Sequence, residues 1–135
     1  MTAGRIRISE AAALLGVSDD TIRRWGDGGR LEIERGAGPA TVDAAALAAL
    51  ASESAAASPV ASLTRGGHSS ARNRVTGIVT RVVKDTVMAQ VELQAGPFRF
   101  VSLMSREAAD ELGLEPGSIA VASVKATNVV IELTD

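Results

Sequence analysis

The sequence predicts an α+β protein of two small domains: a mainly α N-terminal domain with a helix-turn-helix, and a C-terminal five-stranded β-barrel with one short helix. A length of 135 residues suits one ordinary domain or two very small ones. In the first part of the chain, hydrophobic residues follow a helical spacing, and Ala and Leu are frequent. In the last part they occur in short runs of Val, Ile and Thr. Between them, Ser, Ala, Gly and Pro dominate. We therefore expect domains at residues 1–51 and 70–135, joined by a flexible linker over residues 52–69.

The composition excludes several classes of protein. With 46% hydrophobic and 22% charged residues, the chain is not expected to be disordered. The absence of Cys and the single His rule out disulfides, a thiolate nucleophile and a Cys/His zinc site. No acid–base pair or phosphate-loop motif is recognisable, so we do not expect an enzyme. The net charge of −2 argues against DNA binding by bulk positive charge. Apolar runs are too short for a membrane span, and a cytoplasmic protein is expected.

The first residues contain the signals of two consecutive helices. Ser9 is expected to cap a helix from Glu10 to Leu15, and Gly16 to end it in a left-handed turn. Ser18 is then expected to cap a second helix, with two aspartates in the first turn, where negative charge suits the helix dipole. A helix, a glycine-containing turn and a second helix make the geometry of a helix-turn-helix.

The remainder of the N-terminal domain is expected to add a hairpin and a third helix. The glycine-rich run 26–29 predicts a tight reversal after the second helix. Leu31 and Ile33 alternate with glutamates, as in one strand of a small hairpin. A third helix is expected from Val42 to Leu50.

The second half reads as a small β domain. Ser105 is expected to cap a short helix over residues 106–112, which Gly113 ends. Five β-branched or alternating runs are compatible with a compact, partly open, OB-like barrel. The expected strands are 75–83, 87–94, 98–103, 119–127 and 129–133.

The string ISEAAALLGVSDDTIRRW, residues 8–25, resembles the DNA-binding module of excisionase and MerR-type winged regulators. The likeness covers Ile6 to Leu50. It implies that the second helix enters the major groove of DNA and that the hairpin over residues 28–35 is the wing. Arg pairs with guanine edges or phosphates, and Ser and Thr hydroxyls contact either. The residues assigned to DNA in this way are Ser18, Thr21, Arg23, Arg24, Arg30 and Arg35.

A second interpretation of these residues stays open, because each of them also fits a solvated helix face. The Trp25 side chain is expected to pack in the core of the domain rather than to stack on DNA bases. Residues 1–70 contain seven Arg against eight Asp and Glu. A single chain is therefore expected to bind DNA weakly, and binding is expected to depend on salt and on assembly.

Three segments of the second half supply hydroxyl and cationic groups. In an extended strand Lys125 and Thr127 share a face, and Ser105 at a helix start lies beside free backbone N–H groups. A tetrahedral divalent oxyanion only accepts hydrogen bonds, so its host needs several donors and one or two cations, with no carboxylate nearby. The segments suit such an ion; they are Ser70-Ala71-Arg72-Asn73, Ser102-Leu103-Met104-Ser105 and Lys125-Ala126-Thr127.

In this order and spacing, the segments resemble the molybdate-binding Mop domain of the molbindin and TOBE family, with Ser-Ala-Arg-Asn and Lys-Ala-Thr as signatures. The likeness covers Ser70 to Leu133. It implies a barrel that binds molybdate or tungstate between subunits, without an organic cofactor, in a homo-oligomer that is dimer-based and reaches up to a hexamer. The site residues that it implies are Ser70, Arg72, Ser102, Ser105, Lys125, Ala126 through its main-chain amide, and Thr127.

Taken together, the two resemblances imply a molybdate- or tungstate-responsive transcriptional regulator, with DNA, the oxyanion and its own copies as partners. One alternative is an oxyanion storage or buffering protein whose N-terminal domain has another role. Another is a DNA-binding protein whose barrel has lost its ligand. In that case Ser70 and Arg72 are linker residues, Ser105 only caps a helix, and Lys125 is a surface cation.

Overall fold

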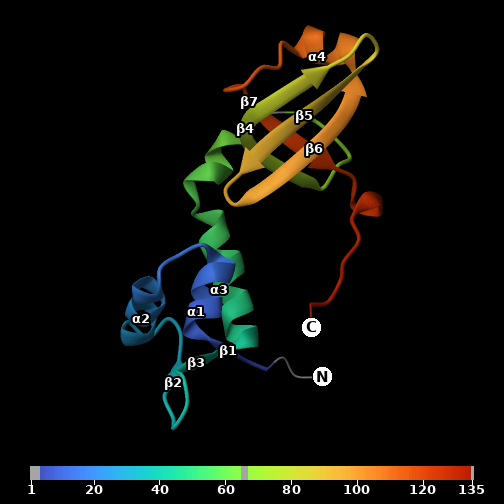
Figure 1. Ribbon diagram of the computed structural model, residues 1–135. Helices are drawn as coiled ribbons and strands as arrows, with labels where there is room; N and C mark the ends of the chain where they lie inside the picture. Colours follow the sequence, from blue (N-terminus) through green and yellow to red (C-terminus); the bar gives the residue numbers. More distant parts are fainter. Residues whose placement is uncertain (1–3, 65–66, 135) are drawn as a thin grey trace. The chain divides into compact units, whose positions relative to one another are not determined.

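The computed structural model describes residues 4–64 and 67–134, and the chain divides into two compact units at Ala61/Ser62 (Figure 1). The N-terminal unit contains three helices and a small three-stranded sheet. The C-terminal unit contains a four-stranded sheet and one helix. In the described ranges, no helix has the length and apolarity needed to cross a membrane.

The first helix, α1 (Ile8–Leu15), begins two residues earlier than predicted. Its N-cap is Arg7, whose backbone is extended and whose side chain caps nothing. Ser9 therefore lies inside the helix and is not the cap. Gly16 ends α1 as predicted: it has a φ of 68°, which a glycine adopts without a steric penalty.

The second helix, α2 (Asp19–Asp27), begins at the predicted cap, where the Ser18 hydroxyl accepts a hydrogen bond of 3.1 Å from the Thr21 N–H. It continues through Gly26, where a reversal was expected. Gly28 N–H still donates to Arg24 O at 2.9 Å, so the helical hydrogen-bond pattern persists and the left-handed turn comes at Gly29.

Three short strands form the sheet of the N-terminal unit: β1 (Arg5–Arg7), β2 (Ile33–Glu34) and β3 (Thr41–Asp43), in the order β1-β3-β2. Both pairings are antiparallel. The central strand takes up residues that were expected to open the third helix. These residues form a strand because of contacts with distant parts of the chain. Val42 pairs with Ile6 on one side and with Ile33 on the other, and it is fully buried.

The third helix, α3 (Ala44–Ala56), begins after this strand, with Asp43 accepting a hydrogen bond of 2.9 Å from Ala46 N–H. It continues five residues into the segment expected to be a linker, and a 3-10 helix, η1 (Pro59–Leu63), follows. Alanine has the highest helix propensity, and the buried Leu47 and Leu50 fix the helix on the core.

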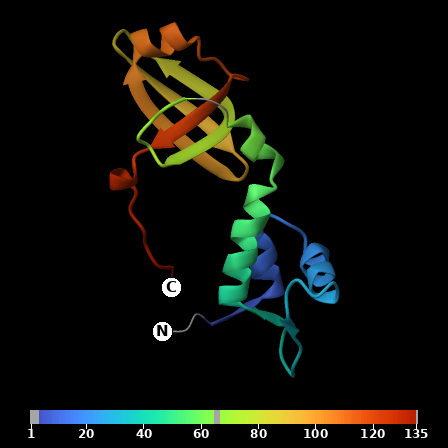
Figure 2. The same ribbon diagram turned by 180° about the vertical axis from the view of Figure 1, so that it is seen from behind.

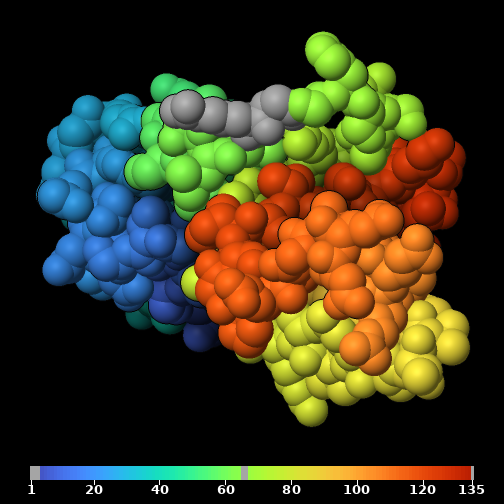
Figure 3. All heavy atoms as spheres, turned by 90° about the horizontal axis from the view of Figure 1, so that it is seen from above, coloured from blue at the N-terminus to red at the C-terminus, as the bar shows by residue number. Residues whose placement is uncertain are grey.

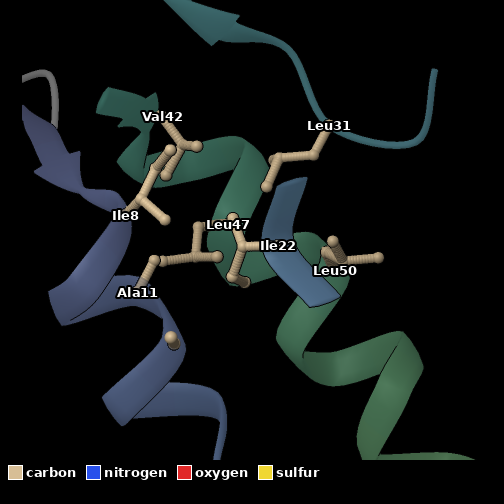
Figure 4. Packing of buried hydrophobic residues seen from close by; sticks show 8 residues of the cluster. Ile8, Ala11, Ile22, Leu31, Val42, Leu47 and Leu50 are labelled. Atoms are coloured by element: carbon tan, nitrogen blue, oxygen red, sulfur yellow. The ribbon is translucent and has the colours of Figure 1, made fainter. Parts of the chain in front are cut away.

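The helices and sheet of the N-terminal unit enclose one apolar core. Figure 4 shows Ile22 of α2 beside Leu47 of α3, with Ala11 of α1 and Leu50 of α3 close by. Trp25 packs against the same core, partly buried, as predicted.

The sheet of the C-terminal unit is antiparallel, in the order β6-β5-β4-β7 (Figures 1 and 2). The long strand β4 pairs with β7 along its first half and with β5 along its second half, with a bulge after Val79 between the two. Such a bulge bends a strand, so this pairing curls the sheet. The strands are β4 (Asn73–Lys84), β5 (Met88–Ala95), β6 (Phe98–Ser105) and β7 (Ile119–Val124).

The prediction of a fifth strand is wrong for the described chain. β7 ends at Val124, and a short 3-10 helix, η2 (Ala126–Asn128), replaces the end of the expected strand. Its turns hold the backbone through bonds from Asn128 N–H to Lys125 O, 2.9 Å, and from Val129 N–H to Ala126 O, 3.3 Å. Residues 129–134 are in no strand and run away from the sheet (Figures 1 and 2). Consequently Lys125 and Thr127 do not share the face of a strand.

The helix α4 (Arg106–Leu112) has the predicted bounds and both predicted caps. The Ser105 hydroxyl accepts a hydrogen bond of 3.1 Å from Ala108 N–H, and Gly113 ends the helix with a φ of 63°. Arg106 N–H donates to Val87 O at 2.8 Å, which ties the start of α4 to the β4–β5 turn. In Figure 3 the orange atoms of α4 lie against the yellow atoms of this turn.

Candidate functional site

The pairing of β4 with β7 brings two of the three predicted segments together. Asn73, the first residue of β4, is opposite Val124, the last residue of β7, and its side-chain amide donates to Val124 O at 3.1 Å. Arg72 precedes this pair directly and Lys125 follows it directly. The Ser70–Asn73 segment and the Lys125–Thr127 segment therefore meet at one end of the sheet.

The two cations at this end have no carboxylate partner. Arg72 and Lys125 are exposed, and neither forms an ion pair with any residue in the described ranges. Elsewhere in the same unit, Lys84 binds Asp110 at 2.5 Å, and Arg99 binds Glu92. Two uncompensated positive charges at one end of a sheet attract an anion.

Ser102, in the second predicted segment, lines a cleft that the end of β7 also lines. The edge strands β6 and β7 line one cleft of about 540 Å³. Its walls are mostly apolar, and Ser102 from β6 and Ser123 from β7 supply hydroxyl groups. Because Ser123 lies two residues before Lys125, this cleft extends along the strand that leads to the two cations.

Ser105 lies elsewhere in the single chain. It is opposite Met88 in the β5–β6 register, and the next residue, Ala89, is opposite Lys84 at the far end of β4 from Asn73. Its hydroxyl caps α4, and its neighbours around a shallow depression include Glu107, Asp110 and Glu111. One chain alone therefore does not bring Ser105 to Arg72 and Lys125.

Two aspartates near the start of α4, Asp110 and Asp85, have a lowered pKa. A hydrogen bond from Lys84, helped by the charges of Lys84 and Arg106, holds the pKa of Asp110 below its usual value of 3.8. Hydrogen bonds from the N–H groups of Met88 and Val87 lower the pKa of Asp85 in the same way. In the described ranges, no three acidic or His side chains are grouped to hold a metal ion.

The remaining predicted residues of the third segment, Ala126 and Thr127, lie exposed in η2. Two residues of the site were not predicted from the sequence: Asn73, which positions the two segments, and Ser123, which lines the cleft. Asn73 stands inside a segment that was already singled out. For Ser123, the sequence offers only its spacing of two residues from Lys125, which places both on one face of an extended strand. Which residues line the cleft depends on how the sheet curls, and the sequence does not show this.

Three of the residues predicted to contact DNA are joined by hydrogen bonds on α2. The Ser18 hydroxyl lies 2.9 Å from the Thr21 hydroxyl, and Arg24 donates to the Thr21 hydroxyl at 3.1 Å. Arg23, also exposed, forms an ion pair with Asp20 at 3.6 Å. These contacts arrange hydroxyl and guanidinium groups along the solvent side of one helix.

The two other predicted arginines differ in their surroundings. Arg30 lies over the Trp25 ring, 5.3 Å from its centroid, and pairs with Glu53 of α3 at 3.9 Å. Its charge is therefore partly balanced. Arg35 is exposed on the connection between β2 and β3.

The geometry is that of a small curled β domain in which Arg72 and Lys125 meet at one end of the sheet, with a separate helical unit before it. Comparison with known proteins agrees with this for the C-terminal unit. The family model of the TOBE domain matches residues 69–131. Molybdenum-pterin-binding protein 2 of Clostridium pasteurianum is 40% identical over 63 residues, which cover 46% of this chain and 93% of that protein. Molybdenum-pterin-binding protein 3 of the same organism is 38% identical over the same shares.

Two solved structures are similar to about half of the chain. A molybdate binding protein from Sporomusa ovata is 30% identical, with a TM-score of 0.48, over 50% of this chain and 100% of that chain. The cytoplasmic molybdate-binding protein ModG, in a form with molybdate bound, is 41% identical, with a TM-score of 0.46, over 48% of this chain and 47% of that chain. On the family model and the identity to the clostridial proteins, the chain belongs to the TOBE family.

Proposed function

We propose that the protein is a transcriptional regulator that responds to molybdate or tungstate. In this proposal the C-terminal unit binds the oxyanion and the N-terminal unit binds DNA. The observation that supports the first part most strongly is the pairing of Asn73 with Val124, which gathers Arg72 and Lys125 without a carboxylate partner. Two cations with nearby hydroxyl and amide donors suit an ion that only accepts hydrogen bonds. The names of the clostridial relatives and of ModG point to the same class of ligand.

The proposed oxyanion site lies between copies of the chain. Ser105 is at the opposite end of the sheet from Arg72, so a site that includes both needs residues from two chains. An ion held in this way binds the assembled form more tightly than the separate chains. That difference in affinity is what allows a ligand to shift one assembly toward another.

The DNA-binding part of the proposal depends on α2 and the β2–β3 connection. Ser18, Thr21, Arg23 and Arg24 offer donors on the exposed side of α2, and Arg35 adds a cation on the connection. Arg30 is expected to contribute less, because Glu53 already balances its charge. Oligomers multiply such local contacts, which compensates for the low net charge of each unit.

The oxyanion site is tested by the rise in melting temperature that molybdate, tungstate or sulfate causes. A ligand that binds only the folded protein raises its stability in proportion to the logarithm of its concentration. We expect a rise with molybdate or tungstate in the wild type and its loss in Lys125→Ala. The matched control is Lys84→Ala, which removes the same charge at the other end of β4 and should keep the rise. An equal loss in both variants would contradict the assignment of Lys125.

A storage or buffering role is the second candidate function. It is favoured by the clostridial relative, 93% of whose length is matched by 63 residues, 46% of this chain. A gel shift on DNA from upstream of the protein's own gene, with and without molybdate, separates the two candidates. The regulator predicts a shift that changes with molybdate and weakens in Arg24→Ala. A storage protein predicts no shift under either condition.

A further inference from the structure

The connection between β2 and β3, residues 35–40, presents Arg35 on a loop with little support of its own. It projects beyond the small sheet (Figures 1 and 2), and residues 35–39 are exposed. Two of its residues are glycines, whose backbone is the least restricted of all. In the described chain, no backbone hydrogen bond joins residues 36–39 to one another. The position of Arg35 therefore depends on how the two ends of the connection are held.

One side chain from outside the connection bonds both of its ends. Arg5 of β1 donates from Nε to the Thr41 hydroxyl and from Nη2 to the Thr41 carbonyl, each at 3.1 Å. The same Nη2 lies 3.1 Å from Oε2 of Glu34. Glu34 is the last residue of β2 and Thr41 is the first residue of β3, so they flank the connection. A planar guanidinium has several N–H donors and serves two residues at once.

The Arg5 side chain reaches across the whole sheet to make these bonds. β1 and β2 lie on opposite sides of β3, and neighbouring strands are about 4.8 Å apart. In the register, Arg7 rather than Arg5 is directly opposite Thr41. Arg7 nevertheless forms no ion pair in residues 4–64. The bonds of Arg5 are therefore specific to that side chain and do not follow from strand pairing alone.

The ion pair of Arg5 also leaves Arg35 available. Glu34 directly precedes Arg35 in the sequence, and its carboxylate is the acceptor that Arg5 engages. Within residues 4–64, Arg35 itself forms no ion pair. An exposed guanidinium without a carboxylate partner suits a phosphate, which it binds with several N–H groups.

We infer, on the basis of the DNA binding proposed for the N-terminal unit, that Arg5 is a positioning residue. By bonding Glu34 and Thr41 it fixes both ends of the β2–β3 connection, and this holds Arg35 in place for a DNA phosphate. Arg5 itself makes no contact with DNA. The fixing of the connection concerns the free protein, and the role of Arg35 concerns the complex, so each is tested by a separate measurement.

The fixing of the connection is tested without DNA, by trypsin cleavage of the full chain after Arg35. Cleavage of a loop follows the population of its open form, so a freed loop is cut faster. We expect Arg5→Ala to raise the rate at which a new end appears at Gly36 about fivefold, measured by mass spectrometry. The matched control is Arg7→Ala, which removes the same charge from the same strand and should leave this rate unchanged. Cleavage after Arg24 of α2 should also stay unchanged, because the core of the unit is not altered.

A second variant removes a single acceptor of Arg5 and keeps the arginine. Thr41→Val preserves the shape of the side chain but lacks the hydroxyl that accepts from Nε. The bonds to the Thr41 carbonyl and to Glu34 remain possible, so we expect a smaller rise in cleavage after Arg35, about twofold.

The role in DNA binding is tested by gel shifts on the DNA fragment from upstream of the protein's own gene. We expect Arg5→Ala to weaken binding about threefold. If Arg5 acts through Arg35, adding Arg5→Ala to Arg35→Ala should weaken binding no further than adding Arg7→Ala, which measures the effect of losing a nearby charge.

Three results would overturn the inference. One is an unchanged rate of cleavage after Arg35 in both Arg5→Ala and Thr41→Val. Another is a rise in Arg5→Ala that is equally large after Arg24, because that result means general loosening of the unit. The third is a full additional loss of DNA affinity when Arg5→Ala is combined with Arg35→Ala. A wild-type protein that gives no gel shift would contradict the proposed function and the role of Arg35 with it, whereas the cleavage rates would still decide whether Arg5 fixes the connection.

Discussion

The two units of this protein are of similar size but differ in how completely they bury their apolar side chains. In the N-terminal unit, Ile22 and Val42 are fully enclosed by three helices and a small sheet. In the C-terminal unit, the buried cluster is small, and apolar residues such as Leu103 and Ile131 are in solvent.

The difference indicates that the two units respond differently to changes in their apolar side chains. The N-terminal unit has a closed core and offers only its surface to a partner. The C-terminal unit has a four-stranded sheet with two edge strands, and it leaves several large apolar side chains exposed. The following predictions test this comparison, from the largest expected effect to the smallest.

The largest effect is expected from opening the core of the N-terminal unit. Ile22→Ala leaves a cavity between α1, α2 and α3, and should lower the free energy of unfolding of this unit by about 3 kcal/mol. Trp25 is the single tryptophan of the chain, so its fluorescence during urea unfolding reports on this unit alone. Leu14→Ala, at a site 71% exposed, is the control and should cost no more than about 0.5 kcal/mol. Equal effects would mean that the core is not closed.

A smaller effect is expected from adding a methyl group where two strands approach closely. A Cβ at Gly77 would lie 2.5 Å from the backbone oxygen of Gln94, which cannot move without shifting β5. Gly77→Ala should lower the stability of the C-terminal unit by about 2 kcal/mol, measured as a calorimetric transition.

The matched variant in the N-terminal unit is Gly26→Ala. There the added Cβ overlaps two side-chain atoms of Ile33, Cδ1 and Cγ1, and not the backbone, so only one side chain has to change its rotamer. The gain in helix propensity, about 1 kcal/mol, offsets the cost of moving it. We expect a change of less than about 1 kcal/mol, and a loss as large as that of Gly77→Ala would contradict the explanation.

The helix caps provide a third comparison. Ser18→Ala and Ser105→Ala each remove a side-chain acceptor from a helix start, and each should cost about 1 kcal/mol in its own unit. Ser105→Asp keeps the cap and adds a negative charge. If Ser105 also contacts an oxyanion in the assembled protein, this variant should stay stable and lose the molybdate-induced rise in melting temperature. A full rise in Ser105→Asp would limit Ser105 to its role as a cap.

The smallest effect is expected in acid. The pKa of Asp85 and that of Asp110 are lower in the folded protein than their usual value of 3.8. Their contribution to stability is therefore present above that value and is lost as the pH falls through the folded pKa. Asp85→Asn and Asp110→Asn should make the acid loss of stability of the C-terminal unit less steep. Melting temperatures measured from neutral pH down to acid test this, and unchanged slopes would contradict it.

The ends of helices were predicted best where a single residue determines the backbone conformation. Gly16 and Gly113 end helices with positive φ, and Ser18 and Ser105 cap helices, as the sequence indicated. The predictions were less accurate where distant residues compete for a segment. The expected start of the third helix is a strand, because Val42 fills the space between two other strands.

The candidate site was also predicted only in part, because its geometry depends on residues far apart in the sequence. The sequence identified Arg72 and Lys125 as donors from residue type and from the family resemblance. It had no means of finding that Asn73 and Val124 pair, or that Ser105 lies at the other end of β4, because register is set by pairing across the whole sheet.

The sequence by itself determined the two-part organisation, the caps and turns, and the supply of hydroxyl and cationic groups, since these follow from local backbone preferences and side-chain chemistry. The tertiary structure decided which of these groups meet and where the sheet stays open. Contacts between residues far apart in the chain depend on pairing register and burial, which no short stretch of sequence specifies. Residues 129–134 have a local preference for a strand, but the structure places them in none.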